Sequence, residues 1–590
     1  DDKKARDYRR AEIAARLTDA ELKGSRSSLA TAERLARETL LDGDGLPAGE
    51  RARFAHGLAR ALMLRGAKTG DDAAVHEALG VLETAGADAE ALPAGERARL
   101  LLDAGRAGGQ IALAAGDAAA LADVGTKFAA AAALARQAGD RATEAEARFR
   151  HVQALYYRWA AAPSLMLFAA LQGELGALVA MLDTDGDIDP VSARYAVRAP
   201  QIALDLAMRL NTTEALSTAT EMNAMTAGLF DRERFPLLWA EIAATGGRIG
   251  LEWADRFGDL SGLSAALEAH EAALAIFRQA GARAAALDAA WQRALTLVAI
   301  GLREDGTQRL AAARDALDAV ESDPLAGSNP RQLRLVRLQK ARVRAGIGRR
   351  RGDAAMLREA VAGLRAAHEG FDPAAEPQLA TFAQAELGKA VQALAALADD
   401  AEGLRQGVDL LETAIGHYEA WQAPATNPVP FVELFAHYAD AAARLALATG
   451  SPGDIDRAVA AGTRINRHMQ DFDNQQGIAL TANTLAFVIV QGLRADFDAG
   501  RLALAEEMAA TALARAPALP AFAGYFENTA CEVRTEKARR HADLAAARQA
   551  LALCESGLAK LRSLEDAEAV ATAQKALARA KALVATLAAR

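Results

Sequence analysis

Apolar residues along this chain recur at the three- and four-residue spacing of an amphipathic helix. In the segment LSAALEAHEAALAIFRQAG, Leu263, Leu267, Leu274 and Phe277 fall on one stripe, and His270 completes it. No stretch of the sequence alternates apolar and polar residues in the manner of a half-buried strand. The pattern therefore predicts an all-α chain with very high helix content.

Two verbatim copies of one octapeptide show that the helices repeat. LPAGERAR occupies residues 46–53 and again residues 92–99, 46 residues later. Each copy places a proline at the start of a helix and a glutamate in its first turn, where the helix dipole is positive. The first copy leads into an apolar helix, a turn at residues 66–72 and a second helix. One repeat is therefore predicted to be a pair of helices.

A second pair of similar segments extends this period. RQAGDR at residues 136–141 recurs as RQAGAR at residues 278–283, an offset of 142 that is close to three units of about 47. Turns that contain Gly or Gly-Asp return farther on, at residues 301, 348–353, 399–403 and 450–454. A helix pair cannot bury its apolar face alone, so we expect the pairs to stack as an α-solenoid of antiparallel helix pairs.

Two segments resemble the tetratricopeptide-repeat (TPR) superfamily, especially its long, alanine-rich bacterial members. LARQAGDRATEAE at residues 134–146 and HEAALAIFRQAGAR at residues 270–283 both look like the second helix of one repeat running into the next. The similarity covers roughly residues 30–150 and 260–465, although the unit is longer than the family's usual length of about 34 residues. The resemblance implies a TPR-like right-handed superhelix whose concave groove binds peptides or partner helices.

These patterns divide the chain into four segments. TPR-like helical repeats are expected over residues 1–149 and again over residues 263–465. An irregular helical segment that is rich in methionine and aromatic residues separates them at residues 150–262. Residues 466–590 lose the period, and we expect them to cap the solenoid with long helices.

The irregular segment holds five of the nine methionines and the aromatic residues Tyr156, Tyr157 and Trp159. One interpretation is that larger side chains fill a less regular helix junction. The other is an adaptable apolar groove for a partner, because methionine and aromatic side chains suit such surfaces. The sequence leaves both interpretations open.

One predicted helix, at residues 331–351, carries a basic face. The face covers about a third of the helix circumference at roughly 100° per residue. Its four cations are Arg334, Arg337, Lys340 and Arg344. Either this face is solvated and pairs with acidic neighbours such as residues 315–321, or it is a clamp for an acidic peptide, a carboxylate terminus or a polyanion.

Motifs for catalysis, nucleotide binding and metal binding are missing from the sequence. It has no HExxH pair of zinc ligands, no GxxxxGK[ST] phosphate loop and no GxSxG nucleophile elbow. We therefore predict no catalytic residue, no cofactor and no metal centre. The acidic loop at residues 183–189 partly resembles a calcium loop, but Met181 and Ser192 stand where two of the main ligands belong. A solvated turn is favoured over weak calcium binding.

Composition narrows the class of protein further. The chain has 590 residues, of which 52% are hydrophobic and only 5% aromatic, and its net charge of -9 gives no reason to expect nucleic acid as a partner. Cys531 and Cys554 are expected to be small core residues and not a disulfide pair. The most apolar stretch, residues 164–182, contains Gln172 and Glu174, so we expect a buried helix and no membrane span.

The sequence favours a non-enzymatic scaffold that binds a partner protein or peptide on a concave helical surface. An alternative is the sensor or regulatory arm of a larger effector enzyme, such as a protease-like or NTPase protein, because similar repeats are fused to such effectors. The chain opens on Asp1 without an initiator Met, so a processed product or a fragment is expected. The partner, the oligomeric state and the compartment stay open, the cytoplasm being slightly favoured over the periplasm and secretion.

Overall fold

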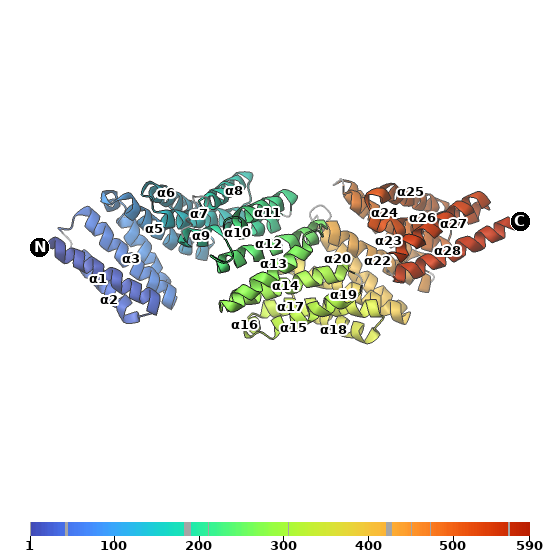
Figure 1. The fold of residues 1–590 in the computed structure, drawn as a ribbon, viewed down its shortest axis with the longest axis horizontal. Coiled ribbons are helices and arrows are strands. Elements are labelled where there is room, and N and C mark those ends of the chain that lie inside the picture. Colours follow the sequence, from blue (N-terminus) through green and yellow to red (C-terminus); the bar gives the residue numbers. More distant parts are fainter. Residues whose placement is uncertain are drawn as a thin grey trace. The chain divides into compact units, whose positions relative to one another are not determined.

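Every regular element that the computed structural model describes is a helix (Figure 1). The described residues are 2–41, 45–181, 190–210, 212–304, 306–420, 428–449, 451–471, 474–564 and 567–590. They contain no strand, so the predicted all-α class is confirmed. The calcium-like loop at residues 183–189 lies outside the described residues.

The chain divides into two compact units. Residues 1–207 and 217–245 form the N-terminal unit, and residues 208–216 and 246–590 form the C-terminal unit. The boundary falls inside the irregular segment that the sequence places at residues 150–262. The division into four segments stays a prediction.

Consecutive helices of the N-terminal part pack against each other in pairs from α1 to α8. The first helices of the pairs, α1, α3, α5 and α7, also each contact the next one. The bounds up to the boundary region are α1 Asp2–Lys23, α2 Arg26–Leu41, α3 Ala48–Thr69, α4 Asp72–Thr84, η1 Asp88–Ala91, α5 Ala94–Ala115, α6 Ala118–Gln137, α7 Arg141–Ala161, α8 Leu165–Ala180, α9 Pro190–Ala196, α10 Ala199–Leu210 and α11 Thr213–Ala227. Helices α3, α5 and α7 begin 46 and 47 residues apart, which agrees with the predicted period.

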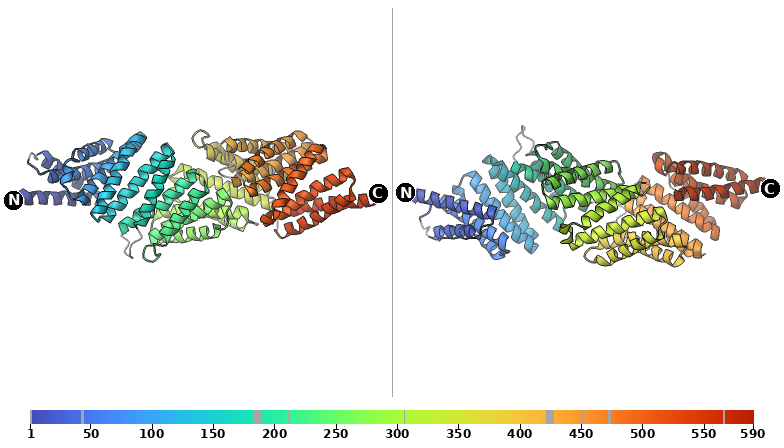
Figure 2. Two further views of the ribbon diagram at one scale, coloured as in Figure 1. Left: turned by 90° about the horizontal axis from the view of Figure 1, so that it is seen from above. Right: turned by 60° about the horizontal axis from the view of Figure 1, so that its bottom comes forward.

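The same arrangement continues in the C-terminal part, where Figure 2 shows paired helices side by side. The bounds are α12 Pro236–Phe257, α13 Leu263–Gln279, α14 Arg283–Arg303, α15 Gln308–Glu321, α16 Pro324–Gly327, α17 Pro330–Arg351, α18 Ala354–Gly370, α19 Pro377–Ala398, α20 Ala401–Ala420, α22 Pro428–Thr449, α23 Pro452–Asp471, α24 Gln475–Ala495, α25 Ala499–Arg515, η2 Ala516–Ala518, η3 Pro520–Phe522, α26 Ala523–His541, α27 Leu544–Arg562 and α28 Ala567–Ala588. Helices α14, α17 and α19 begin 47 residues apart. Stacked helix pairs of this kind are the solenoid that the TPR resemblance implies.

The helix period extends beyond the regions where the sequence shows it. Helix α9 begins at Pro190 and α12 at Pro236, 46 residues later, within the segment expected to be irregular. Helices α24 and α26 begin 48 residues apart, in the region after residue 466 where the sequence shows no period. The amino-acid sequence of the repeats differs in these regions from that of the other repeats, but each helix must still bury one apolar face against its neighbours.

A Gly-Asp dipeptide builds several of the turns within a pair. Gly352 ends α17 in the left-handed conformation with a φ of 62°, which glycine adopts without steric cost. The Asp353 carboxylate then accepts hydrogen bonds from the backbone N–H groups of Ala355 and Met356 at 2.9 and 3.0 Å, which caps the start of α18. Two residues therefore end one helix and begin its antiparallel partner.

Small side chains allow the paired helices to lie very close together. In the pair α5 and α6, an added Cβ atom at Gly105 would lie 2.5 Å from the ring of Phe128. Alanine and leucine supply most of the buried side chains of both units. Close approach of this kind fixes how each pair packs, because even one extra methyl group would force the helices apart.

An arginine near the end of a first helix contacts the end of the preceding first helix in the C-terminal unit. Arg350 of α17 donates hydrogen bonds to the carbonyl oxygens of Gly301 and Leu302 in α14, at 2.7 and 2.9 Å. Arg303 of α14, 47 residues earlier, contacts Asp255 of α12 at 3.1 Å and the carbonyl oxygen of Ala254. The carbonyls of Gly301 and Leu302 are among the last of α14 and have no partner within it, so Arg350 satisfies groups that would otherwise depend on water. The carbonyl oxygen of Ala254 also accepts from the backbone N–H of Gly258 at 3.2 Å.

The two cysteines are joined, which corrects the expectation that they are separate core residues. Cys531 of α26 and Cys554 of α27 are fully buried and form a disulfide, with their Cα atoms 5.2 Å apart. The antiparallel pairing of the two helices brings these positions opposite each other. Spacing along the sequence alone does not reveal that register.

Two of the described helices are long and apolar enough to cross a membrane by length and composition alone, at residues 118–137 and 475–494. The second is mostly buried among its neighbours and contributes Leu485, Ile489 and Leu493 to the core of the C-terminal unit. A buried core helix passes the same test, so these helices are weak evidence for a span.

We expect Arg350→Met to destabilise the C-terminal unit, because two helix-end carbonyl groups lose their donors. The expected loss in the free energy of unfolding is about 1–3 kcal/mol. Arg351→Met is the matched control, because Arg351 is exposed and donates to the Thr307 hydroxyl at 3.0 Å. Urea unfolding followed by circular dichroism measures both variants, and equal midpoints would show that the carbonyl contacts do not stabilise the stack.

His270 is a buried ionisable residue in the core of the C-terminal unit. It is fully buried on α13, and its ring packs against the backbone of Gly247 in α12, where an added Cβ atom would lie 2.6 Å away. Burial, together with the nearby positive charge of Arg248, lowers the pKa of His270 to about 4. The imidazole is therefore neutral in the folded protein above that pH.

Stability should consequently fall as the pH drops from about 6.5 towards 4, because the unfolded chain takes up the proton first. The loss is about 1.4 kcal/mol per pH unit, or roughly 3 kcal/mol in all. His270→Phe, which cannot titrate, should show a smaller loss of unfolding free energy over this range, whereas a variant of exposed His76, His76→Gln, should behave as the parent. Parallel pH profiles for the parent and His270→Phe would contradict this prediction.

Candidate functional site

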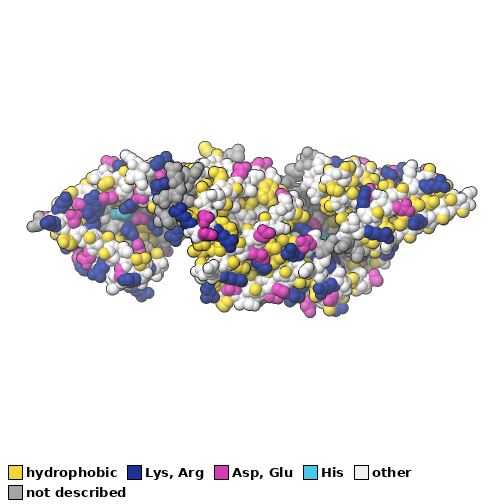
Figure 3. All heavy atoms as spheres, viewed as in Figure 1, with side chains coloured by type: hydrophobic (Ala, Val, Ile, Leu, Met, Phe, Trp, Pro, Cys, Tyr) yellow, Lys and Arg dark blue, Asp and Glu magenta, His cyan; other side chains and the backbone are white. Residues whose placement is uncertain are grey.

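Charged side chains of both signs are interspersed over the face of the molecule drawn in Figure 3. Many charged side chains of the molecule form ion pairs, such as Arg53 with Glu96 at 2.6 Å and Arg99 with Asp140 at 2.7 Å. In both examples the partner lies on, or directly before, the next first helix. Ion pairs of this kind link neighbouring repeats.

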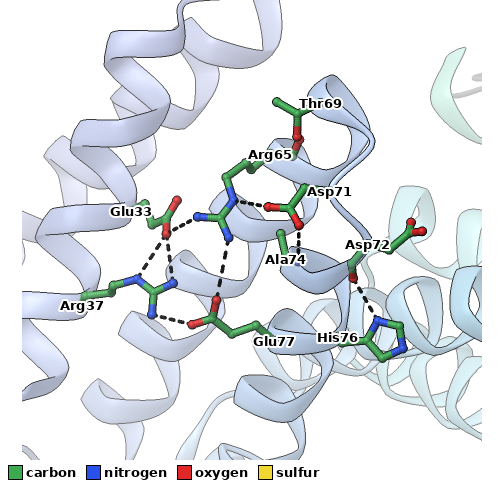
Figure 4. Close-up of polar contacts among 9 residues, drawn as sticks. All are labelled: Glu33, Arg37, Arg65, Thr69, Asp71, Asp72, Ala74, His76 and Glu77. Atoms are coloured by element: carbon green, nitrogen blue, oxygen red, sulfur yellow. Dashed lines mark hydrogen bonds and ion pairs between the residues drawn. The ribbon is translucent and has the colours of Figure 1, made fainter.

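One group of such ion pairs links the first two helix pairs of the N-terminal unit (Figure 4). Arg65 of α3 lies 2.7 Å from Glu33 of α2, and Arg37 of α2 lies 2.5 Å from Glu77 of α4. In Figure 4 the two arginines face the carboxylates of Glu33, Asp71 and Glu77, whereas the Asp72 carboxylate faces no cation drawn there. We interpret the group as a structural link, of modest energy because its arginines are partly exposed to water.

A groove of about 490 Å³ crosses the N-terminal unit, and we call it the N-terminal groove. Successive first helices α1, α3, α5 and α7 line it, and α6 forms part of its floor. Its apolar lining includes Met63, Leu64, Leu113, Leu121, Val124 and Phe128. Its polar lining includes Glu21, Arg60, Asp103, Arg106, Gln110, Arg150, Gln153 and Tyr157. Apolar walls with a few polar groups are typical of binding sites.

Three arginines from successive first helices line this groove. Arg60, Arg106 and Arg150 lie on α3, α5 and α7, 46 and 44 residues apart in the sequence. Arg60 and Arg106 hold the same place in their helices, whereas Arg150 lies three residues before the equivalent position, Gln153. Arg60 pairs with Glu21 at 2.7 Å, and Arg106 pairs with Asp103 at 3.2 Å. The repeat period indicates the match of Arg60 with Arg106, which was not among the predicted site residues.

The structure separates the three aromatic residues that the sequence singles out in this region. Tyr157 lines the N-terminal groove with 42% of its surface exposed, and its ring meets that of half-buried Tyr156 edge-on at 5.7 Å. Trp159 is only 5% exposed and belongs to the core. Tyr157 alone of the three lines the groove, and the role of all three in partner binding stays a prediction.

A second groove, of about 410 Å³, lies in the C-terminal unit along α12, α14, α17, α19 and α22. We call it the C-terminal groove. A chain of charges runs through it: Arg342 lies 3.2 Å from Glu386, and Lys389 lies 2.5 Å from Glu386 and 3.6 Å from Glu433. Arg342 also covers the ring of Phe382, 5.2 Å from its centroid. These four charged side chains of the groove are therefore paired with one another.

Ionisation in the C-terminal groove follows from these pairs. Burial would raise the pKa of Glu386, but Lys389 and Arg342 outweigh it and hold the pKa below its usual value. Lys389 lowers the pKa of Glu433 to about 2. Burial and the positive charges of Lys389 and Arg349 lower the pKa of His437 to about 3. Both carboxylates are therefore charged, and His437 is neutral, at neutral pH.

The basic face predicted at residues 331–351 lies on α17, with acidic residues opposite it. Arg337 lies 2.9 Å from Glu321, and Lys340 lies 2.6 Å from the same carboxylate, at the end of α15. Arg334 lies 3.4 Å from Glu376, and Arg344 is half-buried. The ion pairs of Arg337 and Lys340 involve Glu321, which belongs to the acidic segment at residues 315–321 that the sequence predicts as a neighbour of this face. A role for these cations in binding stays a prediction.

Clusters of potential metal ligands are not expected from the sequence motifs, and the described residues can be compared for such clusters directly. These residues contain no group of three or more His, Cys, Asp and Glu side chains that could hold a metal ion. The ionisable side chains described above in the C-terminal groove pair with one another.

Comparisons with known proteins add little to this picture. No family model matches the chain, and no curated protein matches it in sequence. Among solved structures it is similar to yeast Tom70, at 13% identity and a TM-score of 0.34, over 89% of this chain and 96% of that one. It is also similar to the APC/C hetero-tetramer Cut9-Hcn1, at 14% identity and a TM-score of 0.33, over 96% of this chain and 95% of that one. Similarities at this level identify neither a family nor a partner, and the helix pairs themselves establish the architecture.

Because Tyr157 is exposed in the groove and Trp159 is buried in the core, we expect truncation of the two side chains to change the free energy of unfolding by very different amounts. We expect Trp159→Ala to lower the free energy of unfolding by about 3–5 kcal/mol, because it leaves a cavity in the core. Tyr157→Ala should change it by less than about 1 kcal/mol. Urea unfolding of the two variants tests this, and a large loss with Tyr157→Ala would mean that Tyr157 is a packing residue.

Proposed function

We propose that this protein is a non-enzymatic scaffold that binds a partner protein or peptide in the N-terminal groove. The observation that carries the proposal is the lining of the groove by side chains from successive helix pairs. A partner segment that lies across α3, α5 and α7 would meet one set of contacts from each repeat. Affinity and specificity would then build up along the groove.

The chemistry of the lining supports a peptide as the occupant. Leu113 and Tyr157 expose 44% and 42% of their surface, and both line the groove. Large side chains that are half exposed beside arginines provide the apolar contact and the hydrogen bonds that anchor protein segments. The net charge of -9 and the pairing of the basic side chains with acids give no support for nucleic acid.

Site-specific photo-cross-linking tests the proposal. A photoreactive phenylalanine derivative would replace Leu113 in the groove or, as the control, Leu41, which is 83% exposed at the end of α2. Leu41 is the more exposed of the two positions, so random collisions should label it at least as strongly as Leu113. We expect Leu113 to give a discrete adduct with one protein in source cells, and Leu41 to give none.

Two further observations decide the result. Tyr157→Ala in the cross-linking protein should reduce the adduct at Leu113 without affecting the thermal melt. Labelling at Leu113 that matches Leu41 in pattern and yield would count against the N-terminal groove as a docking site.

A further inference from the structure

A polar pocket lies among the last helices of the C-terminal unit, and we call it the amide pocket. Its volume is about 430 Å³, within the range of roughly 300–1,000 Å³ that is usual for small-molecule sites. Side chains of α22, α24, α26 and α28 contribute to its lining. Two of them are the amides of Asn483 on α24 and Asn528 on α26, which are 45 residues apart in the sequence. The repeat of the fold therefore brings two amides into one pocket.

The side-chain oxygen atoms of both asparagines are buried and have no hydrogen-bond partner among the described residues. Asn528 is only 7% exposed. A buried acceptor without a donor is costly, and such a group in a native protein requires an explanation. Because both side chains line the amide pocket, a molecule bound there can supply the missing donors.

A neighbouring buried side chain shows that the helix packing itself does not leave acceptors unpaired. Glu532 lies one turn after Asn528 on α26 and is also buried. Its carboxylate accepts hydrogen bonds from Arg494 and Arg579, each at 2.6 Å, and from Gln491 at 3.0 Å. The missing donors at Asn528 are therefore a property of the pocket.

The charges around the amide pocket favour a neutral occupant. Among the described residues, its lining contains no lysine and no arginine. Its two carboxylates have cations from outside the lining: Lys389 lies 3.6 Å from Glu433, and Arg444 lies 2.8 Å from Asp440. Burial lowers the pKa of His437, which also lines the pocket, to about 3, so its imidazole adds no charge at neutral pH. An anion would meet no counter-charge in this lining, and a cation would meet carboxylates that are already paired.

The hydroxyl groups of the lining favour a ligand that carries hydrogen-bond donors. Thr484 already donates to the carbonyl oxygen of Leu480 at 3.0 Å, so it offers a ligand its lone pairs. Thr529 and Thr572 also line the pocket, and a hydroxyl group can both donate and accept. A molecule with several hydroxyl groups matches such a lining, because each of its hydroxyl groups can also donate and accept.

The apolar part of the lining distinguishes this pocket from the N-terminal groove. Phe487 and Tyr525 are half-buried and provide aromatic surface. No described lining residue is a large apolar side chain as exposed as Leu113 or Tyr157 of the N-terminal groove. The amide pocket therefore lacks the protruding anchors that bind protein segments.

We propose that the amide pocket binds a small neutral molecule with several hydroxyl groups, of the class of sugars and polyols. Its hydroxyl groups would donate to the amide oxygens of Asn483 and Asn528, and its C–H surface would pack on Phe487 and Tyr525. The site lies in the C-terminal unit alone, so it does not depend on partner binding in the N-terminal groove.

Saturation-transfer difference NMR of the full chain tests the proposal with a fixed set of probes. The neutral probes are myo-inositol, glucose, galactose, maltose, sucrose and trehalose, and the charged probes are glucosamine and gluconate. We expect at least one neutral probe to give a difference signal and to bind with a dissociation constant below about 1 mM, measured by isothermal titration calorimetry. The charged probes should bind at least about tenfold more weakly, because the lining offers neither charge an unpaired partner.

Asn528→Leu connects the binding to the unpaired amide. It should weaken binding of the best neutral probe at least about tenfold, because the ligand loses a buried acceptor. Without ligand, the same variant should have an unchanged or higher midpoint of urea unfolding, because it removes an unpaired buried oxygen. Asn466→Leu is the contrasting variant. Asn466 is buried outside the pocket and donates to the Thr481 hydroxyl at 2.6 Å, so its replacement should lower the midpoint.

Thr484→Val has a matched control in Thr463→Val. Both hydroxyl groups donate to the carbonyl oxygen four residues earlier, at 3.0 and 2.9 Å, but Thr463 is exposed on α23 and does not line the pocket. We expect Thr484→Val to weaken binding of the neutral probe about fivefold and Thr463→Val to leave it unchanged.

Three results would overturn the proposal. The first is the absence of a difference signal from every neutral probe. The second is binding that neither Asn528→Leu nor Thr484→Val weakens, which would place the ligand elsewhere on the chain. The third is equal affinity for glucosamine or gluconate, which would contradict a neutral site. A lower urea midpoint of ligand-free Asn528→Leu would mean that Asn528 is a packing residue, and it would remove the observation that carries the proposal.

Discussion

A helix pair in this chain can bury its apolar face only against the next pair, so the register between pairs governs everything built on them. In the C-terminal unit that register is held where Arg303 and Arg350 reach the last carbonyls of the preceding first helix. The carbonyls of Gly301 and Leu302 have no partner inside their own helix, and Arg350, one repeat later, supplies the donors. The two arginines thereby link α12 to α14 and α14 to α17. Both steps are 47 residues long, which is the sequence record of that constraint.

The same register places corresponding side chains of successive first helices in rows, and the rows become the walls of the grooves. Where a carboxylate lies opposite each cation at hydrogen-bond distance, as at Glu386, the row links the repeats and little is left over for a ligand. In the N-terminal groove Arg60 pairs with Glu21 and Arg106 with Asp103, so its charged side chains are also linked to one another. The large apolar side chains beside them, such as Leu113 and Tyr157, are what stays exposed to a ligand.

The sequence predicted the repeating part of the fold because the period depends on local chemistry. Pro and Glu in LPAGERAR mark helix starts, and Gly-Asp dipeptides end one helix and cap the next, so both are visible without any contact information. Contacts between helices were not predictable in this way. Tyr157 and Trp159 are two residues apart, roughly 200° around a helix, and the sequence does not say which of them faces the core. The pairing of Cys531 with Cys554, and of Arg337 with Glu321, depends on the register of neighbouring helices.

Helix α17 shows why so few positions of such a fold remain for function. Val336 and Val343 face the core, Arg337 faces the acidic end of α15, and Arg342 faces the C-terminal groove. Each first helix therefore gives one side to its own pair and one to each neighbouring pair, which leaves a narrow strip for a ligand. A basic face predicted from residue spacing alone can lie on a side of the helix that packs against a neighbouring pair, as readily as on the part that is exposed to a ligand. Positions one period apart on successive first helices, such as Arg60 and Arg106, are therefore the ones to compare when the lining of a groove is sought.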